Sequence, residues 1–317
     1  MIKIKPKYMS YALTWRCNSK CKVCNTWKIN DHKNELTLEE IKNIFKDNFF
    51  NNIKETVLTG GEPFLRYDIT DIAKIIHNKT GSSIGVTTNA LLSEKVFVFV
   101  KNMLKNNIPI GVYISLDGPE KIHDELRGVS GNFKRIIKLL RRLVSIEDKN
   151  LTVSAGMTVS KDNINYINET DNICKEIGCE LSIRLNEYAG YFHNRKTNLN
   201  FSNLQKKKII KSLLFLEHDK NLKNYYKRLI SFLERETWEK FSCTAAKSSL
   251  IIDPRGNVYP CPNLMENPEF LMGNLRNESF KNIWTSYKSE LIRKKNSGCH
   301  HCLNICEYFW GLSLRVT

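Results

Sequence analysis

Short apolar runs alternate with segments whose apolar residues recur every three or four positions, from the N-terminal region to about residue 185. A short apolar run bounded by turn residues is typical of a buried strand, and the longer spacing is typical of an amphipathic helix. Strands are therefore predicted at 8–15, 56–58, 83–88, 108–116, 151–159 and 180–185. Helices are predicted from a capping box at Thr37 and Glu40, and at 69–76, 93–104, 132–144 and 164–177. Six strand–helix alternations predict an α/β fold with a parallel sheet and crossover helices.

The pattern changes after the sixth strand. Residues 198–241 are amphipathic and predict one or two helices, and from about residue 242 cysteine, glycine and proline become frequent. In this last part, 248–253 and 256–259 predict a β-hairpin that turns at Pro254 to Gly256, followed by a basic helix. We therefore expect two domains, at residues 1–240 and 241–317.

Composition and charge narrow the class of protein. The chain has 317 residues, of which 41% are hydrophobic, and no apolar run approaches the ~18 residues of a membrane helix. The basic N-terminus lacks a following apolar segment, so a cytoplasmic protein is expected. The net charge of +16 raises the possibility of nucleic-acid binding. The compact basic runs at 206–208 and 293–295 look like solvated helix faces, so nucleic acid is not the expected partner. A basic surface would instead attract an acidic flavodoxin or ferredoxin.

Eight of the ten cysteines fall in two groups with metal-ligand spacing. Cys17, Cys21 and Cys24 follow the first predicted strand at a C-x3-C-x2-C spacing, so that one tight loop can direct three thiols to a common point. Thiolates select zinc or an iron–sulfur cluster. A structural zinc site needs a fourth ligand, which is not found nearby, whereas three ligands on a four-iron cluster leave one iron open. Because these thiols are expected to bind metal, we expect the protein to work in a compartment in which thiols stay reduced.

This cysteine spacing, followed by Thr59-Gly-Gly-Glu-Pro63 after the second strand, resembles the radical S-adenosylmethionine (SAM) enzymes. The residue before the third cysteine is usually aromatic in that family and is Val23 here. The resemblance implies an open, partial (β/α)6 TIM-like barrel and a [4Fe–4S] cluster whose open iron binds SAM. It also implies reductive cleavage of SAM to methionine and a 5′-deoxyadenosyl radical, which abstracts hydrogen from a substrate.

The resemblance assigns SAM-binding roles to residues at the ends of successive strands, where such barrels have their active sites. These residues are Gly60, Gly61, Glu62, Pro63, Thr88, Asn89, Ser115, Asp117, Arg127 and Ser154. The Gly60–Pro63 loop is expected to bind the methionyl amino group through backbone acceptors, with the Glu62 carboxylate as a further candidate. Asn89 is expected to bind the ribose or to cap the next turn. Arg127 is expected to bind the carboxylate of SAM or to form a structural ion pair.

The second group of cysteines resembles the SPASM/twitch extension, a hairpin plus helix that binds auxiliary iron–sulfur clusters. Its members are Cys243, Cys261, Cys299, Cys302 and Cys306. Four of the five are expected to hold one auxiliary [4Fe–4S] cluster, with Cys306 either replacing another ligand or binding nothing. A zinc ribbon is the alternative.

The likeness predicts an oxidoreductase or maturase that modifies a peptide or protein by oxidation, crosslinking or epimerisation. The alternatives are a radical SAM dehydrogenase or C–C bond-forming enzyme acting on a small molecule, and a zinc or iron–sulfur RNA-binding protein without catalysis. Peptide-modifying relatives commonly carry a peptide-binding domain ahead of the barrel. The first strand begins by Tyr8, so this chain is expected to lack one. No catalytic residue is assigned; Cys179, Glu187 and Tyr188 are candidates.

Overall fold

The computed structural model describes residues 5–194, 200–216, 222–235, 243–296, 303, 308 and 310. Within these residues, one nine-stranded sheet has the order β6-β5-β4-β3-β2-β1-β7-β8-β9. The first six strands are parallel to their neighbours, as predicted. The strands are β1 (Tyr8–Ala12), β2 (Glu55–Thr59), β3 (Ser83–Thr88), β4 (Ile110–Ser115), β5 (Leu151–Val159), β6 (Glu180–Leu185), β7 (Ser249–Ile252), β8 (Asn257–Tyr259) and β9 (Gly273–Asn274).

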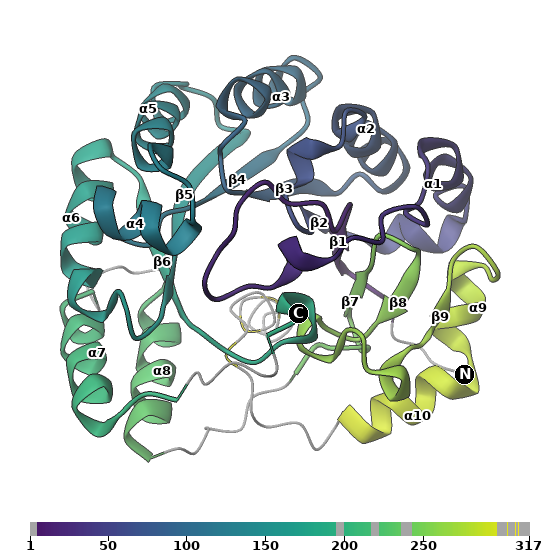
Figure 1. Cartoon of the computed structure of the whole chain (residues 1–317). Coiled ribbons are helices and arrows are strands. Elements are labelled where there is room, and N and C mark those ends of the chain that lie inside the picture. Colours follow the sequence, from purple (N-terminus) through teal and green to yellow (C-terminus); the bar gives the residue numbers. More distant parts are fainter. Residues whose placement is uncertain are drawn as a thin grey trace.

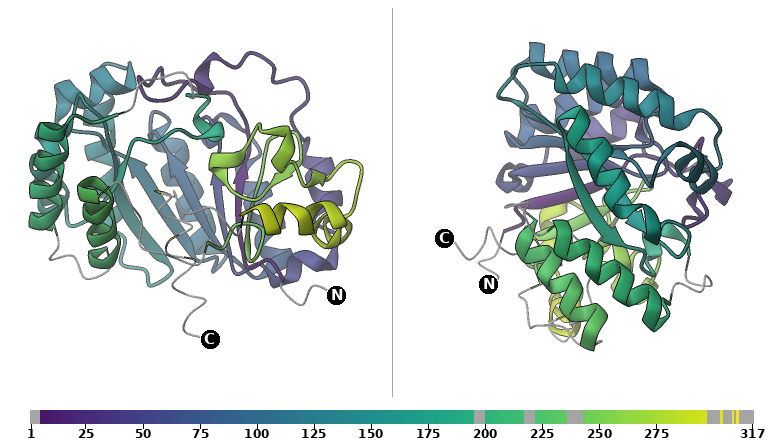
Figure 2. Two further views of the ribbon diagram at one scale, coloured as in Figure 1. Left: turned by 90° about the horizontal axis from the view of Figure 1, so that it is seen from below. Right: turned by 90° about the vertical axis from the view of Figure 1, so that its left-hand side faces the viewer.

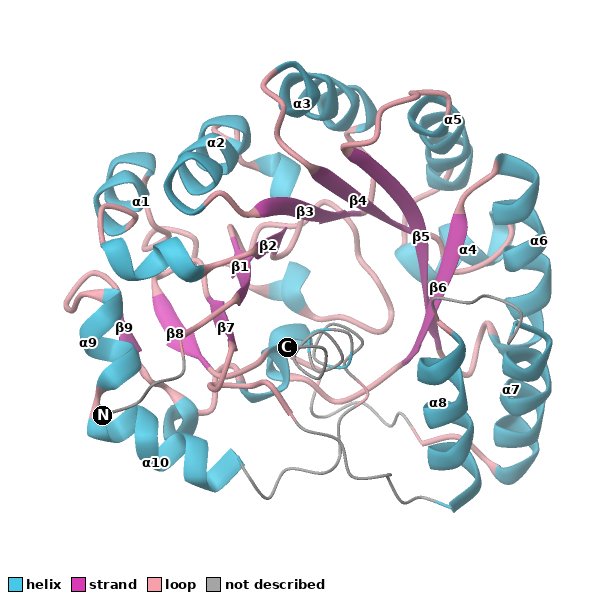
Figure 3. Ribbon diagram, turned by 180° about the vertical axis from the view of Figure 1, so that it is seen from behind, coloured by secondary structure: helices cyan, strands magenta, loops and turns pink. Residues whose placement is uncertain are grey.

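The sheet curves into an open arc with helices on its outer side (Figures 1 and 3). Helices α7 and α8 lie beyond β6, and α9 and α10 lie at the other end beside β9 (Figures 1 and 2). The α-helices described are α1 (Leu38–Ile44), α2 (Ile69–Thr80), α3 (Ser93–Lys105), α4 (Glu120–Arg127), α5 (Asn132–Val144), α6 (Ile167–Ile177), α7 (Asn203–Phe215), α8 (Lys223–Arg235), α9 (Phe280–Thr285) and α10 (Tyr287–Asn296). This arrangement confirms the prediction of a partial TIM-like barrel.

Local signals place most of these elements. The predicted capping box is present at α1, where the Thr37 side chain accepts from the Glu40 backbone N–H and the Glu40 carboxylate accepts from the Thr37 N–H. Helix α5 buries Ile136, Leu139, Leu140 and Leu143, which lie on one helical face, against the sheet. Removing one such side chain by a substitution to alanine costs about 2–5 kcal/mol.

One predicted helix differs from the structure, and one helix of the structure was not predicted. Residues 164–177 are not one helix, because a 3-10 turn at Ile164–Tyr166 precedes α6. Helix α4 was not predicted, since its eight residues bury only His123 and Leu126 and thus carry too little apolar periodicity. The segment 198–241 contains two helices, α7 and α8, as one of the two predicted possibilities. None of the described helices is both long and apolar enough to span a membrane.

The C-terminal hairpin is continuous with the barrel sheet. Strand β7 pairs in parallel with β1, with Tyr8 opposite Ser249, and β8 turns back antiparallel to β7. The turn lies at Pro254 to Gly256, as the sequence predicts, and Gly256 has a φ of 86° there. The strand that precedes the first cysteine group and the strand that follows Cys243 are therefore hydrogen-bonded neighbours. The predicted domain boundary near residue 240 lies outside the described residues.

Candidate functional site

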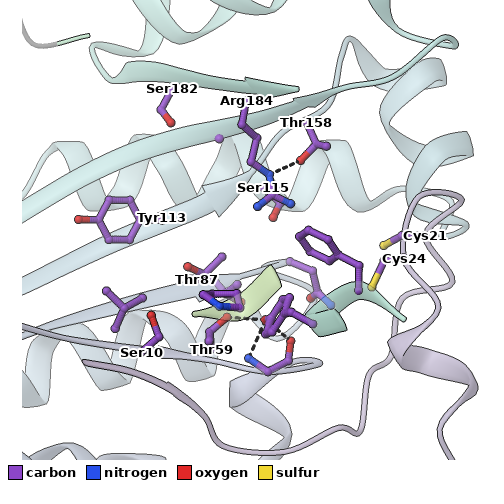
Figure 4. A pocket seen from close by; sticks show the side chains of 18 of the residues that line it. Ser10, Cys21, Cys24, Thr59, Thr87, Tyr113, Ser115, Thr158, Ser182 and Arg184 are labelled. Atoms are coloured by element: carbon purple, nitrogen blue, oxygen red, sulfur yellow. Dashed lines mark hydrogen bonds between the residues drawn. The ribbon is translucent and has the colours of Figure 1, made fainter. Parts of the chain in front are cut away.

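A cavity of about 660 Å³ lies on the inner side of the sheet. This volume is in the range of small-molecule and cofactor sites. Its wall includes side chains from β1 to β6 and from the loops that follow them (Figure 4). Of the residues named from the sequence, those that line it are Cys17, Cys21, Cys24, Gly60, Gly61, Thr88, Asn89, Ser115, Arg127, Ser154 and Glu187.

The three N-terminal cysteines all reach this cavity from one loop after β1. Backbone hydrogen bonds from Lys20 and Lys22 to the carbonyls of Arg127 and Leu126 hold the loop against the end of α4. The close contact depends on Gly128, where an added Cβ would lie 2.8 Å from the Lys20 carbonyl oxygen. The unpredicted helix α4 therefore supports one side of the cysteine loop.

The thiols suit an iron–sulfur cluster better than a single metal ion. Burial raises the pKa of Cys17 to about 12 and also raises the pKa of Cys21, so that ionised thiolates here need a strong positive charge beside them. Among the described residues, no three His, Cys, Asp or Glu side chains lie close enough together to hold one ion. Cys17, Cys21 and Cys24 would each hold a different iron of a four-iron cluster, which needs no single point within reach of all three sulfurs. Three thiols spaced around a cavity fit that group.

Gly60 and Gly61 bring the loop after β2 against the cysteine loop. An added Cβ would lie 2.4 Å from the Thr14 carbonyl oxygen at position 60 and 2.2 Å from that of Arg16 at position 61. Because glycine has no Cβ, the two segments can approach closely, and the Gly61 N–H donates to the Thr14 carbonyl oxygen at 2.7 Å. The sequence predicted close approach to a ligand at these glycines. The structure shows that they also permit close approach of two chain segments.

Glu62 and Pro63 lie outside the cavity lining. Glu62 is 1% exposed, and its carboxylate accepts hydrogen bonds from the Thr88 hydroxyl and the Asn89 N–H, both at 2.8 Å, and from the Phe64 N–H at 3.2 Å. Burial raises the pKa of Glu62 to about 7, although these bonds favour the ionised form. The carboxylate considered as a SAM ligand is thus engaged in joining the loops after β2 and β3. Pro63 begins the 3-10 turn η3 (Pro63–Leu65).

Asn89 makes the turn-capping contact that was one of its two expected roles, and the ribose contact stays a prediction. Its side-chain oxygen accepts from the Leu91 N–H at 3.0 Å, which is the turn-capping contact. Its amide nitrogen donates to Asn18 at 2.8 Å and lies 4.0 Å from the Cys17 sulfur. Asn89 therefore fixes its own turn and at the same time faces the cysteine loop from the cavity wall.

Asp117 and Arg127 form an ion pair at the cavity edge. The Asp117 Oδ2 atom lies 2.6 Å from Arg127 Nε, and Oδ1 accepts from the Thr158 N–H at 2.9 Å. Arg127 Nη1 donates toward the Cys21 sulfur at 3.7 Å. Burial works to lower the pKa of Arg127, but Asp117 and Cys21 outweigh it and the pKa lies above its ordinary value. Arg127 is thus a fixed cation beside a cysteine of the predicted cluster.

His123 has a structural place near this ion pair. It is fully buried outside the cavity lining, and its Nδ1 atom accepts from the Asp117 N–H at 3.1 Å. Its Nε2 atom lies 3.1 Å from the side-chain nitrogen of Asn132. Burial lowers the pKa of His123 to about 4.

The loop after β6 carries a residue that the sequence did not single out. Tyr191, in the 3-10 turn η5 (Gly190–Phe192), lines the cavity and places its hydroxyl 2.6 Å from the Gly60 carbonyl oxygen. The Thr26 hydroxyl donates to the Tyr191 carbonyl oxygen at 3.2 Å, and the Cys24 thiol donates to Thr26 at 3.1 Å. No local pattern marks this tyrosine, because its contacts with Gly60 and Thr26 join segments distant in the sequence.

The same loop contacts the C-terminal extension. Glu187 accepts from the Asn263 side-chain amide at 2.9 Å, and His193 lies 2.6 Å from Glu266. Burial raises the pKa of Glu187. At Gly190 an added Cβ would lie 1.8 Å from the Met265 carbonyl oxygen. Residues 187–194, named here the bridging loop, therefore contact both the cysteine loop and the segment after Cys261.

The remaining candidate residues also divide into those that line the cavity and those that do not. Of the three catalytic candidates, Glu187 lines the cavity, Tyr188 is 45% exposed elsewhere, and Cys179 is buried in the core beside Cys174. Cys243 and Cys261 are half-buried near the two ends of the hairpin. Cys299, Cys302 and Cys306 lie outside the described residues, so the choice of four auxiliary ligands stays a prediction.

A barrel-like parallel sheet with three thiols at its cavity defines a class of protein, and comparison with known families agrees. The family model of the radical SAM superfamily matches residues 11–173, just over half of the chain, and the chain belongs to that superfamily. A second model, the SPASM iron-sulfur cluster-binding domain, matches residues 243–303. The two families imply a [4Fe–4S] cluster with SAM at the first site and iron–sulfur binding at the second, rather than the zinc alternatives.

Relatives with both regions are similar over most of this chain. The antilisterial bacteriocin subtilosin biosynthesis protein AlbA of Bacillus subtilis is 25% identical over 89% of this chain, which spans 60% of AlbA. The mycofactocin maturase MftC of Mycobacterium tuberculosis is 24% identical over 98% of this chain and 81% of its own length. The crystal structure of Streptococcus suis SuiB bound to the precursor peptide SuiA has a TM-score of 0.71 at 18% identity, covering 93% of this chain and 68% of SuiB.

Proposed function

We propose that this chain is a radical SAM enzyme of the maturase type, which modifies a peptide held at the cavity between the sheet and the SPASM domain. The observation that supports this most directly is the convergence of three cysteines, the Gly60–Gly61 backbone and Arg127 on one cavity. When bound at Cys17, Cys21 and Cys24, a [4Fe–4S] cluster supplies the electron that splits SAM into methionine and a hydrogen-abstracting 5′-deoxyadenosyl radical.

The residues of this chain have distinct tasks in that reaction. Arg127, held by Asp117, offers positive charge to the carboxylate of SAM and to the Cys21 thiolate. The paired loops at Gly60 and Cys17 fix the distance between the amino-group acceptors and the cluster. Asn89 and Ser154 offer polar groups to the ribose. The bridging loop closes the side of the cavity that faces the SPASM domain, which limits the access of water to a reactive radical.

The described functions of the relatives support a peptide substrate. The relatives named above are described as a bacteriocin biosynthesis protein and a mycofactocin maturase, and SuiB was crystallised with a precursor peptide. We propose that this chain likewise acts on a peptide, with oxidation, crosslinking or epimerisation as the reaction classes. Glu187, on the cavity wall next to the SPASM segment, is placed to accept a proton from a substrate that is being oxidised.

The electron donor is proposed to be an acidic flavodoxin or ferredoxin. The chain carries a net charge of +16, and complementary charge accelerates association at low ionic strength. Reduction of the cluster by such a protein should slow markedly as salt is raised, because surface charges are screened over about 10 Å at 0.1 M salt. A reduction rate that is independent of salt contradicts this part of the proposal.

The proposed chemistry is tested by anaerobic reconstitution with iron and sulfide, followed by reduction in the presence of SAM. The expected products are methionine and 5′-deoxyadenosine, measured by liquid chromatography and mass spectrometry. The triple variant in which Cys17, Cys21 and Cys24 are alanine should form neither product and bind less iron. Cys174→Ala is the matched control, since Cys174 is buried away from the cavity and should retain both. Iron-free protein, or a reduced cluster that leaves SAM intact, contradicts the proposal.

A further inference from the structure

Arg184 lines the cavity from β6, the strand at one end of the sheet (Figure 4). Along β6 the odd-numbered residues Leu181, Ile183 and Leu185 are buried in the core, because successive side chains of a strand point to opposite faces. Ser182 and Arg184 are on the other face and line the cavity (Figure 4). The sequence pattern of this strand therefore places one long cation inside the site.

The side chain of Arg184 is held at its Nε atom and on one face of its guanidinium group. Its Nε atom donates to the Thr158 hydroxyl at 2.9 Å, and its guanidinium carbon lies 4.6 Å from the centre of the Phe192 ring. Within the part of the chain that the structure describes, no carboxylate lies within ion-pairing distance of Arg184, and its two Nη groups donate no hydrogen bond. The guanidinium fork is thus oriented by the protein but has an open end.

The charges around the cavity make this open end distinctive. Arg127 and Arg184 are the only lysine or arginine side chains among the described residues of the lining. Arg127 is paired with Asp117 at 2.6 Å, whereas Arg184 has no carboxylate within ion-pairing distance. The lining also includes Glu55, Glu180 and Glu187, and Arg184 interacts with Glu187 beyond that distance. Arg184 is partly buried, and a guanidinium without a close anion is stabilised when a ligand supplies a planar one.

We propose that Arg184 is the receptor for a carboxylate group of the substrate, an aspartate or glutamate side chain of the peptide. This inference rests on the proposed function, because it assumes that the cavity receives a peptide. The two Nη groups match the two oxygens of a carboxylate, which gives a bidentate pair with directional specificity. Thr158 and Phe192 keep the fork fixed, so little side-chain freedom is lost on binding. SAM also has a carboxylate, for which Arg127 is the proposed partner, and the experiment below separates the two sources.

The test uses the reconstituted full-length chain with SAM bound and a pool of synthetic peptides blocked at both ends. Each peptide that contains Asp or Glu is paired with an otherwise identical one that contains Asn or Gln. Affinity selection followed by mass spectrometry gives the enrichment ratio of each pair. We expect the acidic members to be enriched about tenfold by the natural chain, as for one charge-assisted contact. Arg184→Gln should abolish this preference. Arg184→Lys should retain only part of it, because lysine keeps the positive charge but lacks the planar fork of a guanidinium group.

Two further measurements, SAM affinity and formation of 5′-deoxyadenosine, separate a peptide receptor from a SAM-binding residue. Equilibrium dialysis should give Arg184→Gln the affinity of the natural chain for SAM, and the variant should still form 5′-deoxyadenosine without a peptide. A tenfold loss of SAM affinity overturns the proposal, because Arg184 would then bind SAM. Equal enrichment of acidic and amide peptides by the natural chain, or an unchanged preference in Arg184→Gln, also overturns it. If the natural chain forms no 5′-deoxyadenosine, the proposed function fails, while the enrichment ratio still tests the carboxylate receptor independently.

Discussion

The hydroxyl of Tyr191 donates a hydrogen bond to the carbonyl oxygen of Gly60 at 2.6 Å. The same hydroxyl accepts from the Gly60 N–H at 2.9 Å and lies 2.6 Å from the Thr59 hydroxyl. The backbone at Gly60 is where the family resemblance places acceptors for the amino group of SAM. Tyr191 therefore engages a carbonyl oxygen that the resemblance also assigns to the amino group of SAM, and we predict that the two compete for it.

The first prediction concerns this competition. Tyr191→Phe removes the competing hydroxyl and leaves the ring packed against Trp15. SAM should then bind about three- to tenfold more tightly, since one intramolecular hydrogen bond is worth about 1 kcal/mol. Equilibrium dialysis of reconstituted protein measures the effect. Tyr188→Phe is the matched control, because Tyr188 lies outside the cavity lining, and its SAM affinity should not change. Weaker binding by Tyr191→Phe would mean that the hydroxyl supports the site instead.

The second prediction concerns the paired loops. Gly61→Ala places a Cβ 2.2 Å from the Arg16 carbonyl oxygen, so the loop after β2 must move away from the cysteine loop. We expect the free energy of unfolding to fall by about 3 kcal/mol and the iron content after reconstitution to fall with it. Gly156→Ala is the control, since its Cβ meets nothing within 4 Å and should leave stability close to that of the natural chain. Equal stability of the two variants in urea would contradict the prediction.

The third prediction concerns the contact between the bridging loop and the extension. Glu187 and Asn263 share a hydrogen bond of 2.9 Å across segments 76 residues apart. A double-mutant cycle with Glu187→Ala and Asn263→Ala should give a coupling energy of about 1 kcal/mol in the free energy of unfolding. Strictly additive effects would show that the contact contributes nothing to joining the extension to the barrel.

The fourth prediction concerns pH. Burial lowers the pKa of His123 in the folded chain from 6.5 to about 4, so the unfolded chain binds a proton at a higher pH than the folded chain does. Stability from this residue is therefore complete above pH 6.5 and is lost as the pH falls toward 4, with a loss of about 2 kcal/mol by pH 5. Urea unfolding of the apoprotein at about pH 7.5 and about pH 5 measures this loss.

The control for the pH prediction is His123→Gln, which offers hydrogen-bonding groups but does not titrate. Other groups contribute equally to both proteins, so the difference between the two pH dependences isolates His123. The variant should lose about 2 kcal/mol less than the natural chain between the two pH values. Parallel pH dependences would show that His123 is not the residue responsible.

Some features of this protein can be predicted from short stretches of its sequence. The strands at 83–88, 151–159 and 180–185 and the helix at 132–144 have the predicted bounds, because each carries its own apolar period and its own end signals. The cysteine spacing and the Gly-Gly-Glu-Pro turn likewise indicated the cysteine loop and the loop after β2 that packs against it. In each case the physical cause, a period or a turn, lies within a dozen residues of the effect.

Other features depend on contacts between distant segments. Glu62 lies in the predicted motif, yet the tertiary structure directs its carboxylate to Thr88 and Asn89 instead of the cavity. Tyr191 and Arg184 acquire their significance only because the loop after β6 and the strand β6 close one side of the cavity. No local pattern distinguishes Tyr191 from the other tyrosines of the chain, whereas the alternation along β6 already places Arg184 on the face opposite the core.

The sequence by itself determined the order of the six barrel strands, the cysteine loop and the family, since each is encoded by residue spacing within one short segment. The tertiary structure alone decided which polar groups remain open to a ligand. That outcome depends on which donors and acceptors meet when the sheet curves, and partners such as Tyr191 and Gly60 lie 131 residues apart.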